Sequence, residues 1–216
     1  MRARPESGMT LIEVLVVASL VGIVLGVPLL ALNVSSRSLN TSAASANLNR
    51  RARSSVNRVA DLLAASGSSV IPQAGGGPGI GTSVVDFQRS DGFAGGAIAW
   101  GNPERLVLRS AAKDPDDGID NDGDGRVDEK RLVWIQDFGS ASPVTTVLCD
   151  GVADALEGEL PGNGVDDNGN GLIDEQGFVL EFDGDQVVVR ITLTRFDSVN
   201  GLVSRTVERA VALRND

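Results

Sequence analysis

Two acidic segments share one pattern, and their side chains have the types and spacing of a metal site. The first is DGIDNDGDGRVDE at 117–129 and the second is NGVDDNGNGLIDE at 163–175. Asp or Asn recurs at alternate positions, and a glycine stands where the chain must turn sharply. Alternating oxygen side chains on a tight loop converge on one point, which suits the six to eight oxygen ligands of calcium. The repeat therefore predicts calcium-type loops rather than a magnesium site, because magnesium requires stricter octahedral geometry.

The candidate ligands follow from the alternation. In the first loop, taken as 114–129, they are the side chains of Asp120, Asp122, Asp124 and Asp128, the carbonyl of Arg126, and Glu129 to complete the shell. In the second loop, 163–175, they are the side chains of Asp166, Asn168, Asn170 and Asp174, the carbonyl of Leu172, and Glu175. We expect one or two calcium ions, with the first loop favoured because the second has two asparagines where the first has two aspartates. The alternative is that Asp, Asn and Gly form simple turns.

The loops differ from an EF-hand in one ligand and in their flanks. An EF-hand places a bidentate Glu at the twelfth position, where this chain has Arg131 and Gly177. Strand-like sequences, rather than helical ones, precede and follow both loops. In sequence, the two segments are more similar to thrombospondin type 3 repeats.

A single carboxylate, Glu13, lies at the start of a long apolar segment. Residues 14–32 contain Ser19 as their only polar side chain, and a helix of roughly 20 apolar residues can cross the hydrocarbon core of a bilayer. An ionised, unpaired carboxylate there costs several kcal/mol. We therefore expect a cationic partner from another copy or from a free amino terminus. The alternative is a glutamate that reaches the membrane interface near the helix end.

The segment GMTLIEVLVVASLVGIVLG at 8–26 resembles the prepilin signature of type IV pilins and type II secretion pseudopilins. Gly8 matches the last residue of the leader, and Met9 matches the first mature residue, which is usually Phe in the family. The resemblance implies that a prepilin peptidase cleaves after Gly8 and methylates the amine of Met9. It also implies that Glu13 neutralises the amine of a neighbouring subunit when the helix moves from membrane to filament core.

The expected elements are one long helix followed by a β-rich domain. The chain divides into a leader peptide at 1–8, a transmembrane and filament-core helix at 9–32, an amphipathic helix extension at 33–66, and a globular periplasmic domain at 67–216. Val56, Val59, Ala60 and Leu63 have the spacing of one helical face. The glycine-rich segment 67–103 predicts a loop region with one or two short strands. Further strands are expected at 105–111, 131–138, 145–152, 178–182, 186–196 and 202–213.

The predicted fold class is α+β. Two hairpins are expected in the globular domain, one through Asp183-Gly184-Asp185 and one through Asn200-Gly201. A long N-terminal helix packed on an antiparallel sheet, here with inserted calcium-type loops, is the pilin-like roll that the resemblance implies. The terminal RTVERAVALRND is also similar to the closing strand of W-type minor pilins and J-type minor pseudopilins.

Composition excludes several classes of function. The net charge of −10 repels phosphates, so no nucleic-acid partner is expected. The chain has no histidine and no nucleophile motif, so it is not expected to be an enzyme. Its one cysteine, Cys149, lies in an apolar run and predicts a buried thiol without a disulfide. The arginines at 50, 51, 53 and 58 predict a solvated helix face or a charge partner for another subunit.

These expectations combine into one function and one alternative. The chain is expected to be a non-enzymatic minor pilin or pseudopilin of a type IV pilus or type II secretion pseudopilus, with a priming or tip role. It would be a single-pass protein of the bacterial inner membrane, with its globular domain in the periplasm, before it enters the filament. Its partners would be prepilin peptidase and other pilin or pseudopilin subunits. The alternative is a membrane-anchored periplasmic calcium-binding module that does not polymerise.

Overall fold

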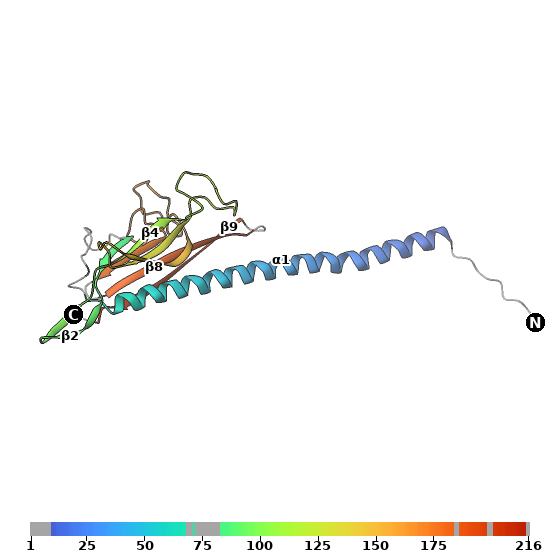
Figure 1. The fold of residues 1–216 in the computed structure, drawn as a ribbon. Helices are drawn as coiled ribbons and strands as arrows, with labels where there is room; N and C mark the ends of the chain where they lie inside the picture. Colours follow the sequence, from blue (N-terminus) through green and yellow to red (C-terminus); the bar gives the residue numbers. More distant parts are fainter. Residues whose placement is uncertain (1–9, 68–70, 72–82, 184–185, 198–200, 215–216) are drawn as a thin grey trace, which may run out of the picture. The chain divides into compact units, whose positions relative to one another are not determined.

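The computed structural model describes residues 10–67, 71, 83–183, 186–197 and 201–214, which form a long helix and nine strands (Figure 1). Within the helix it describes only the backbone at 25–31, 33–34, 37 and 40. The leader with Gly8, the cleavage residue Met9, much of the glycine-rich segment, and parts of both predicted hairpin turns lie outside the described residues. The chain divides into two compact units, 1–43 and 44–216, and each is described by itself.

Helix α1 runs from Leu11 to Ala64, in agreement with the single long helix expected from the sequence. In the first unit the large apolar side chains that the structure describes are exposed; Leu11, for example, is 83% exposed. Among the residues that the structure describes, no helix is long and apolar enough to cross a membrane.

The second unit begins with the last turns of α1, which pack on a β-sheet. The buried helix residues follow a three- and four-residue spacing, so they form one apolar stripe. They are Leu48, Ala52, Val56, Val59, Ala60 and Leu63. Opposite them, alternate residues of strand β8 (Gln186–Asp197) face inward, because successive side chains of a strand point to opposite faces. These are Val187, Val189, Ile191 and Leu193.

The sheet is antiparallel and has seven strands, in the order β1-β4-β5-β6-β8-β7, with β9 on the other edge of β8. Their bounds are Val84–Phe87 (β1), Glu104–Ser110 (β4), Lys130–Gln136 (β5), Val144–Val152 (β6), Phe178–Asp183 (β7) and Gly201–Ala212 (β9). Strands β6 and β7 share one edge of β8, since Val152 pairs with Leu193 and Phe178 pairs with Ile191. Both predicted hairpin pairings, β7 with β8 and β8 with β9, are present.

The glycine-rich segment contains more strand than expected. Besides β1, its described part holds a separate two-stranded ribbon of β2 (Ser90–Ala94) and β3 (Ala97–Trp100). The expectation of one or two strands in 67–103 is therefore wrong. Gly95 and Gly96 both have positive φ, 62° and 87°, and two such residues form the tight turn that joins paired strands.

Two of the four helix arginines tie α1 to the sheet. Arg51 donates to the carbonyl of Asp150 (3.1 Å) and Arg58 donates to that of Leu148 (3.4 Å), both on β6. Between these two carbonyls lies Cys149, a buried free thiol as the sequence predicts, and burial raises its pKa. The arginine group is thus partly structural rather than a uniformly solvated face.

Both acidic loops leave the same end of the sheet (Figure 1). The first joins β4 to β5 and the second joins β6 to β7. Lys130, at the start of β5, pairs with Val152, at the end of β6, so the two loops start from neighbouring strands. The same pairing contains a bulge at Gly151, because Arg131 pairs with Asp150 and leaves Gly151 as the extra residue.

Candidate functional site

Glu13 caps the first turn of α1. Its Oε2 accepts hydrogen bonds from the backbone N–H of Thr10 (2.9 Å) and from the Thr10 hydroxyl (3.1 Å). In return, the Glu13 N–H donates to Thr10 Oγ1 at 3.4 Å. This reciprocal pair is a capping box, which satisfies amide groups that a helix start leaves without partners. Thr10 is a partner that the expectations for Glu13 did not include, although Thr followed three residues later by Glu is the sequence signal for it.

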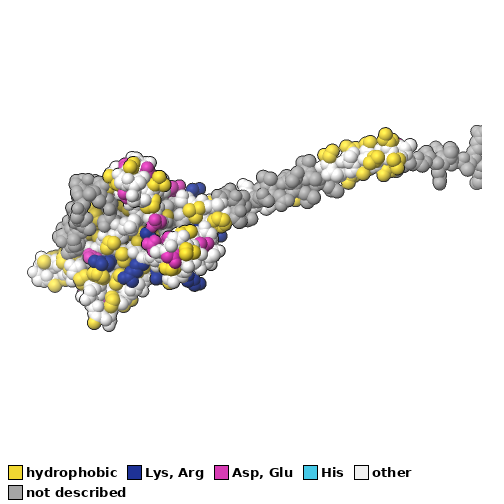
Figure 2. Space-filling view, turned by 90° about the horizontal axis from the view of Figure 1, so that it is seen from above, with side chains coloured by type: hydrophobic (Ala, Val, Ile, Leu, Met, Phe, Trp, Pro, Cys, Tyr) yellow, Lys and Arg dark blue, Asp and Glu magenta, His cyan; other side chains and the backbone are white. Residues whose placement is uncertain are grey.

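Beyond the cap, the described part of α1 up to residue 24 has many exposed apolar side chains. Leu11, Ile12, Leu15, Leu20 and Val24 are each more than half exposed, and Figure 2 shows hydrophobic side chains over the described start of the helix. An apolar surface of this extent marks a site of contact with protein or lipid.

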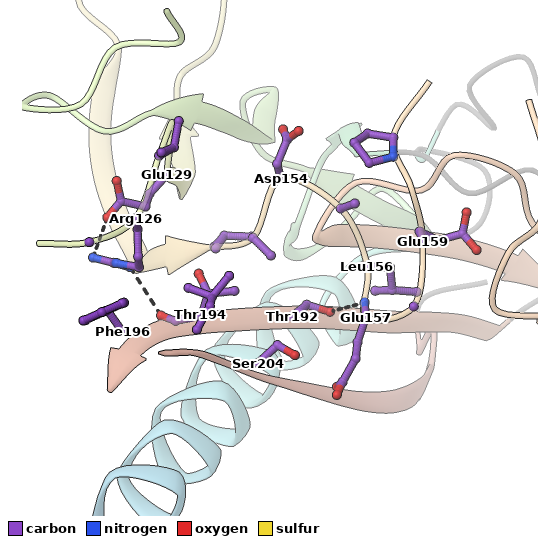
Figure 3. A pocket seen from close by; sticks show the side chains of 18 residues that line it. Arg126, Glu129, Asp154, Leu156, Glu157, Glu159, Thr192, Thr194, Phe196 and Ser204 are labelled. Atoms are coloured by element: carbon purple, nitrogen blue, oxygen red, sulfur yellow. Dashed lines mark hydrogen bonds and ion pairs between the residues drawn. The ribbon is translucent and has the colours of Figure 1, made fainter. Parts of the chain in front are cut away.

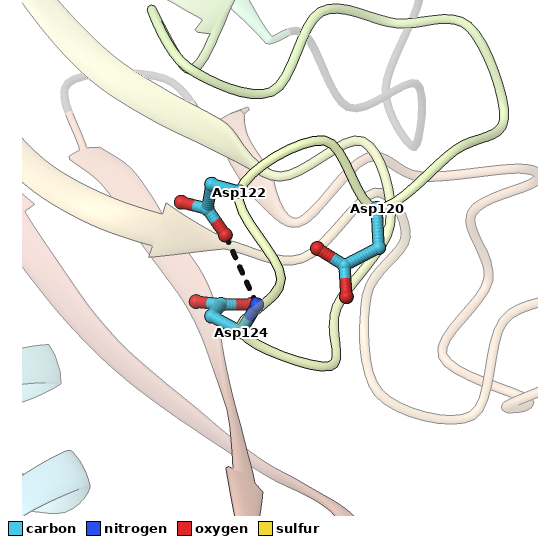
Figure 4. Close-up of side chains that lie close together, drawn as sticks. All are labelled: Asp120, Asp122 and Asp124. Atoms are coloured by element: carbon cyan, nitrogen blue, oxygen red, sulfur yellow. Dashed lines mark hydrogen bonds between the residues drawn. The ribbon is translucent and has the colours of Figure 1, made fainter.

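In the first acidic loop, three of the predicted ligands come together. Carboxylate oxygens of Asp120, Asp122 and Asp124 lie within 4.8 Å of one another, and Figure 4 shows the three side chains gathered around the loop. Glycine N–H groups fix Asp120: Gly123 donates to its Oδ1 (2.7 Å) and Gly125 to its Oδ2 (2.9 Å). The alternation predicted from the sequence therefore yields a convergent oxygen cluster.

Asp128 closes the loop rather than facing that cluster. Its Oδ1 accepts from the N–H of Asp117 (2.8 Å), and its Oδ2 accepts from the N–H of Gly118 (3.0 Å). Asp128 itself has a φ of 55°, a left-handed conformation that Asp tolerates better than most side chains. Asp128 therefore stabilises the shape of the loop by binding the amides at its beginning.

The second loop repeats these bonds residue for residue. Asp166 accepts from the N–H groups of Gly169 (2.7 Å) and Gly171 (2.8 Å). Asp174, with a φ of 53°, accepts from Asn163 N–H (2.9 Å) and Gly164 N–H (2.9 Å). Asn168 Oδ1 accepts from Asn170 N–H at 3.0 Å, as Asp122 Oδ1 accepts from Asp124 N–H at 3.2 Å. The sequence repeat is therefore also a repeat of backbone geometry.

The two loops differ in how one glutamate is held. Arg126 forms ion pairs with Asp124 and with Glu129, the latter at 2.5 Å. It also donates to the carbonyl of Thr194 at 3.3 Å, and Figure 3 shows Arg126 with Glu129 and Thr194. Arg126 was predicted to offer its carbonyl, and its side chain was not considered. The equivalent residue of the second loop, Leu172, is buried.

In that second loop the glutamate has an amide partner instead. Asn170 Nδ2 donates to Glu175 Oε1 at 2.6 Å. Asn170 stands where the first loop has Asp124, and Glu175 stands where it has Glu129. The glutamate is therefore held by a neutral amide in one loop and through a guanidinium in the other.

Buried acids surround the first loop. Asp114 is fully buried and accepts from the N–H groups of Asn121 (2.8 Å) and Glu129 (3.2 Å). A hydrogen bond from the Glu129 carboxyl, followed by the one from Asn121, lowers the pKa of Asp114 to about 2. Burial, followed by the contact with Asp114, raises the pKa of Glu129 to about 7 in spite of Arg126. Arg126 holds the pKa of Asp124 below its usual range.

Three buried carboxylate oxygens receive no N–H or hydroxyl donor within the described chain. They are Oε2 of Glu129, Glu159 and Glu175, and each of these residues is about 5–6% exposed. A buried carboxylate without a partner is costly, and an oxygen-binding cation would relieve that cost. Glu159 also accepts from Asn168 N–H at 2.9 Å, which joins it to the second loop.

Neither Asp114 nor Glu159 was among the predicted ligands. Asp114 precedes the first repeat by three residues, and Glu159 precedes the second by four. Neither belongs to the alternating pattern, so only the folded chain reveals their contacts with the loops.

A groove of about 480 Å³ lies between the first loop and the segment 152–161 that precedes the second, over β8 and β9 (Figure 3). Its walls include Arg126 and Val127 of the first loop, Leu156 and Glu159 before the second, and Phe196 on β8. The Phe196 ring lies so close to Gly125 that a Cβ there would be 2.7 Å from it. The glycine at this position is therefore required by packing as well as by its φ of 88°.

One comparison with known proteins identifies the N-terminal segment. Residues 3–27 match the family model described as the prokaryotic N-terminal methylation motif. The match supports the type IV pilin and pseudopilin family at this coarse level, which implies processing by prepilin peptidase and assembly with other pilin subunits. No curated protein and no solved structure matches the chain.

Proposed function

We propose that this protein is a non-enzymatic minor pilin or pseudopilin, processed by prepilin peptidase and assembled through its N-terminal helix into a type IV pilus or a type II secretion pseudopilus. The observation that carries the proposal is a methylation motif at 3–27 that leads into a helix with exposed apolar side chains. A filament core covers such a surface, and lipid covers it before assembly. The subunit would prime assembly or occupy the filament tip, in the manner of W-type minor pilins or J-type minor pseudopilins.

Glu13 has a defined part in this proposal. Its contacts with Thr10 keep the carboxylate hydrogen-bonded at the helix start. Once Gly8 is removed, Met9 has a free amine next to this capping box, and stacked subunits bring that amine to a neighbour's Glu13. The exchange of hydrogen bonds for an ion pair gives assembly its electrostatic contribution, since an ion pair is stronger away from water.

The proposal includes calcium as a stabiliser of the globular domain. Three converging carboxylates in the first loop support it, as do the buried, donor-free oxygens of Glu129 and Glu175. Carboxylate and carbonyl oxygens are the ligands that calcium prefers. In the first loop Asp120, Asp122 and Asp124 would bind the ion with Glu129; in the second, Asp166, Asn168 and Asn170 would bind it with Glu175.

The converging carboxylates of the first loop also suit a second candidate function, a membrane-anchored periplasmic calcium-binding module that does not polymerise. Such a module would be anchored by its N-terminal helix and would use the acidic loops for binding. The two functions make opposite predictions for the mature N-terminus and for filament incorporation.

The decisive experiment is N-terminal processing. The full chain is expressed with and without prepilin peptidase, and intact and peptide mass spectrometry locates the mature start. We expect an N-methylated Met9 only when the peptidase is present. A chain that still begins at Met1, or one cut near residue 30, contradicts the pilin proposal and favours an ordinary anchor or signal peptide.

Assembly is tested by Glu13→Ala in cells that make the filament. The variant is expected to insert in the membrane at normal levels and to be missing from sheared filaments. Glu13→Gln is the matched control for the capping box, because its amide oxygen still accepts from Thr10 while its charge is gone. Normal incorporation of both variants would rule out pairing between Glu13 and a neighbour's amine.

A further inference from the structure

We infer that Arg126 is a built-in competitor of calcium in the first acidic loop. Its guanidinium engages Asp124 and Glu129, two of the loop's acidic groups, and so weakens calcium binding there. The inference rests on the proposed calcium loops, and it names the residue that sets the relative affinity of the two.

Arg126 occupies both oxygens of Asp124. Its Nε lies 3.2 Å from Oδ1 and 3.0 Å from Oδ2, and its Nη2 forms the ion pair with Oδ2. The Arg126 backbone N–H donates to Oδ1 at 3.0 Å. The same Nη2 lies 2.5 Å from Glu129 Oε1. A calcium ion that coordinates Asp124 must therefore displace the guanidinium from at least one oxygen.

Contacts with strands β6 and β8 hold this guanidinium in place. Nη1 donates to the carbonyl of Thr194 on β8 at 3.3 Å. The guanidinium also lies next to the bulge residue Gly151, where a Cβ would be 2.6 Å from Nη1. The side chain is only 19% exposed, so the pair with Asp124 is screened by solvent less than a surface ion pair would be.

The second loop reaches the same local charge without an arginine. In the first loop, Asp124, Arg126 and Glu129 together carry −1. In the second loop, Asn170, Leu172 and Glu175 also carry −1, because an amide and an aliphatic side chain replace the aspartate–arginine pair. Asn170 bonds to Glu175 directly at 2.6 Å. The differences at these two positions depend on each other. An aspartate at the position of Asp124 lies against a buried glutamate, so a cation such as Arg126 is needed between the two carboxylates.

Two consequences for calcium follow. The first loop is held together without metal by its own cation, so calcium stabilises it less than four acidic ligands without an arginine would allow. Removal of the arginine charge should tighten calcium binding roughly ten-fold, the order that Coulomb's law in water gives for a positive charge about 5 Å from a divalent ion. The expectation that the first loop binds calcium more firmly is thereby weakened.

The test is calcium titration by calorimetry on the full-length protein in detergent, with every variant in an Asp166→Asn background that weakens the second loop. Arg126→Leu, which copies the residue of the second loop, is expected to bind calcium about ten-fold more tightly than the background protein. Arg126→Leu with Asp124→Asn copies the second loop more fully and is expected to lose that gain. Asp120→Asn in the same background identifies heat from residual sites.

A reciprocal variant tests the same effect in the second loop, in case Arg126→Leu does not fold. Asn170→Asp, tested with the first loop weakened by Asp120→Asn, places a carboxylate against Glu175 without an arginine and should tighten the second loop. The inference is overturned if calcium binds to the background proteins and a folded Arg126→Leu variant does not bind it more tightly; if Arg126→Leu does not fold, the inference is overturned when Asn170→Asp does not tighten the second loop. Absence of calcium binding to the unaltered protein would instead overturn the calcium part of the proposed function.

Discussion

The substitution Asp122→Asn distinguishes two possible roles of Asp122, that of a metal ligand and that of a residue that only shapes a turn. Asp122 is exposed, and the only hydrogen bond it forms among the described residues is from Asp124 N–H to its Oδ1, at 3.2 Å. The equivalent Asn168 makes the same bond at 3.0 Å, so asparagine already fits this geometry. The substitution removes one negative charge and leaves the fold of the loop intact.

The expected loss depends on calcium. A carboxylate charge about 3 Å from a divalent ion contributes roughly 2–3 kcal/mol in water-like surroundings. The amide oxygen retains part of that interaction, so about 1–2 kcal/mol is lost from the bound state. A ligand that binds only the folded chain stabilises it in proportion to the logarithm of its affinity. For a domain of this size, each kcal/mol corresponds to roughly 2–4 °C in Tm.

The assay is thermal unfolding of the full-length protein in detergent, followed by tryptophan fluorescence, in excess calcium and in chelator. Trp134 reports on strand β5, which follows the loop, and its indole N–H donates to Glu104 at 2.6 Å. We expect Asp122→Asn to melt about 2–8 °C below the parent protein in calcium and at the same temperature in chelator. Equal losses in both conditions would refute the reasoning and show that Asp122 only shapes a turn.

Three further predictions concern packing. Leu63→Ala should lower the free energy of unfolding by about 2–5 kcal/mol in urea denaturation, because Leu63 is fully buried between helix and sheet; a loss under 1 kcal/mol would contradict that packing. Gly151→Ala should melt below Gly162→Ala, since both have positive φ, 74° and 77°, but a Cβ meets Arg126 only at Gly151; equal melting would mean that the guanidinium is not seated there. Cys149 should react slowly with a thiol reagent at pH 8 and rapidly in denaturant, because burial raises its pKa; fast reaction of the folded protein would refute its burial.

The sequence predicts the helix and most strands well because their patterns are local. Val56, Val59, Ala60 and Leu63 show the period of one helical face, and all four are buried. The alternation along 186–196 likewise marks the inward residues of β8, whose bounds are Gln186–Asp197. The ribbon of β2 and β3 escaped prediction because its strands are short and lie in a glycine-rich text, although its Gly95-Gly96 turn is a hairpin signal.

The site is less predictable because its decisive contacts span the fold. The alternating oxygens of the first loop are visible in the sequence, and three of them converge. The direction of the Arg126 side chain depends on Thr194, which β8 supplies from a distant part of the chain. The burial of Asp114 likewise depends on how the loop folds back on Glu129. Such contacts have no periodic signature, so residues that modulate a metal site are harder to find than its ligands.

Each acidic loop is closed by its own aspartate, Asp128 or Asp174, and this affects how the domain can gain or lose loops during evolution. The side chain at the end of each repeat ties back to the amides at its beginning, so the segment is complete before it reaches the sheet. The first loop joins strands already in register, with Ser110 opposite Lys130, and the second joins two strands that end side by side on β8. A self-contained insert between such ends adds only the modest entropy of a longer connection. Copies of it can therefore be gained, lost or moved between strand connections while the strand pairing beneath them stays as it is.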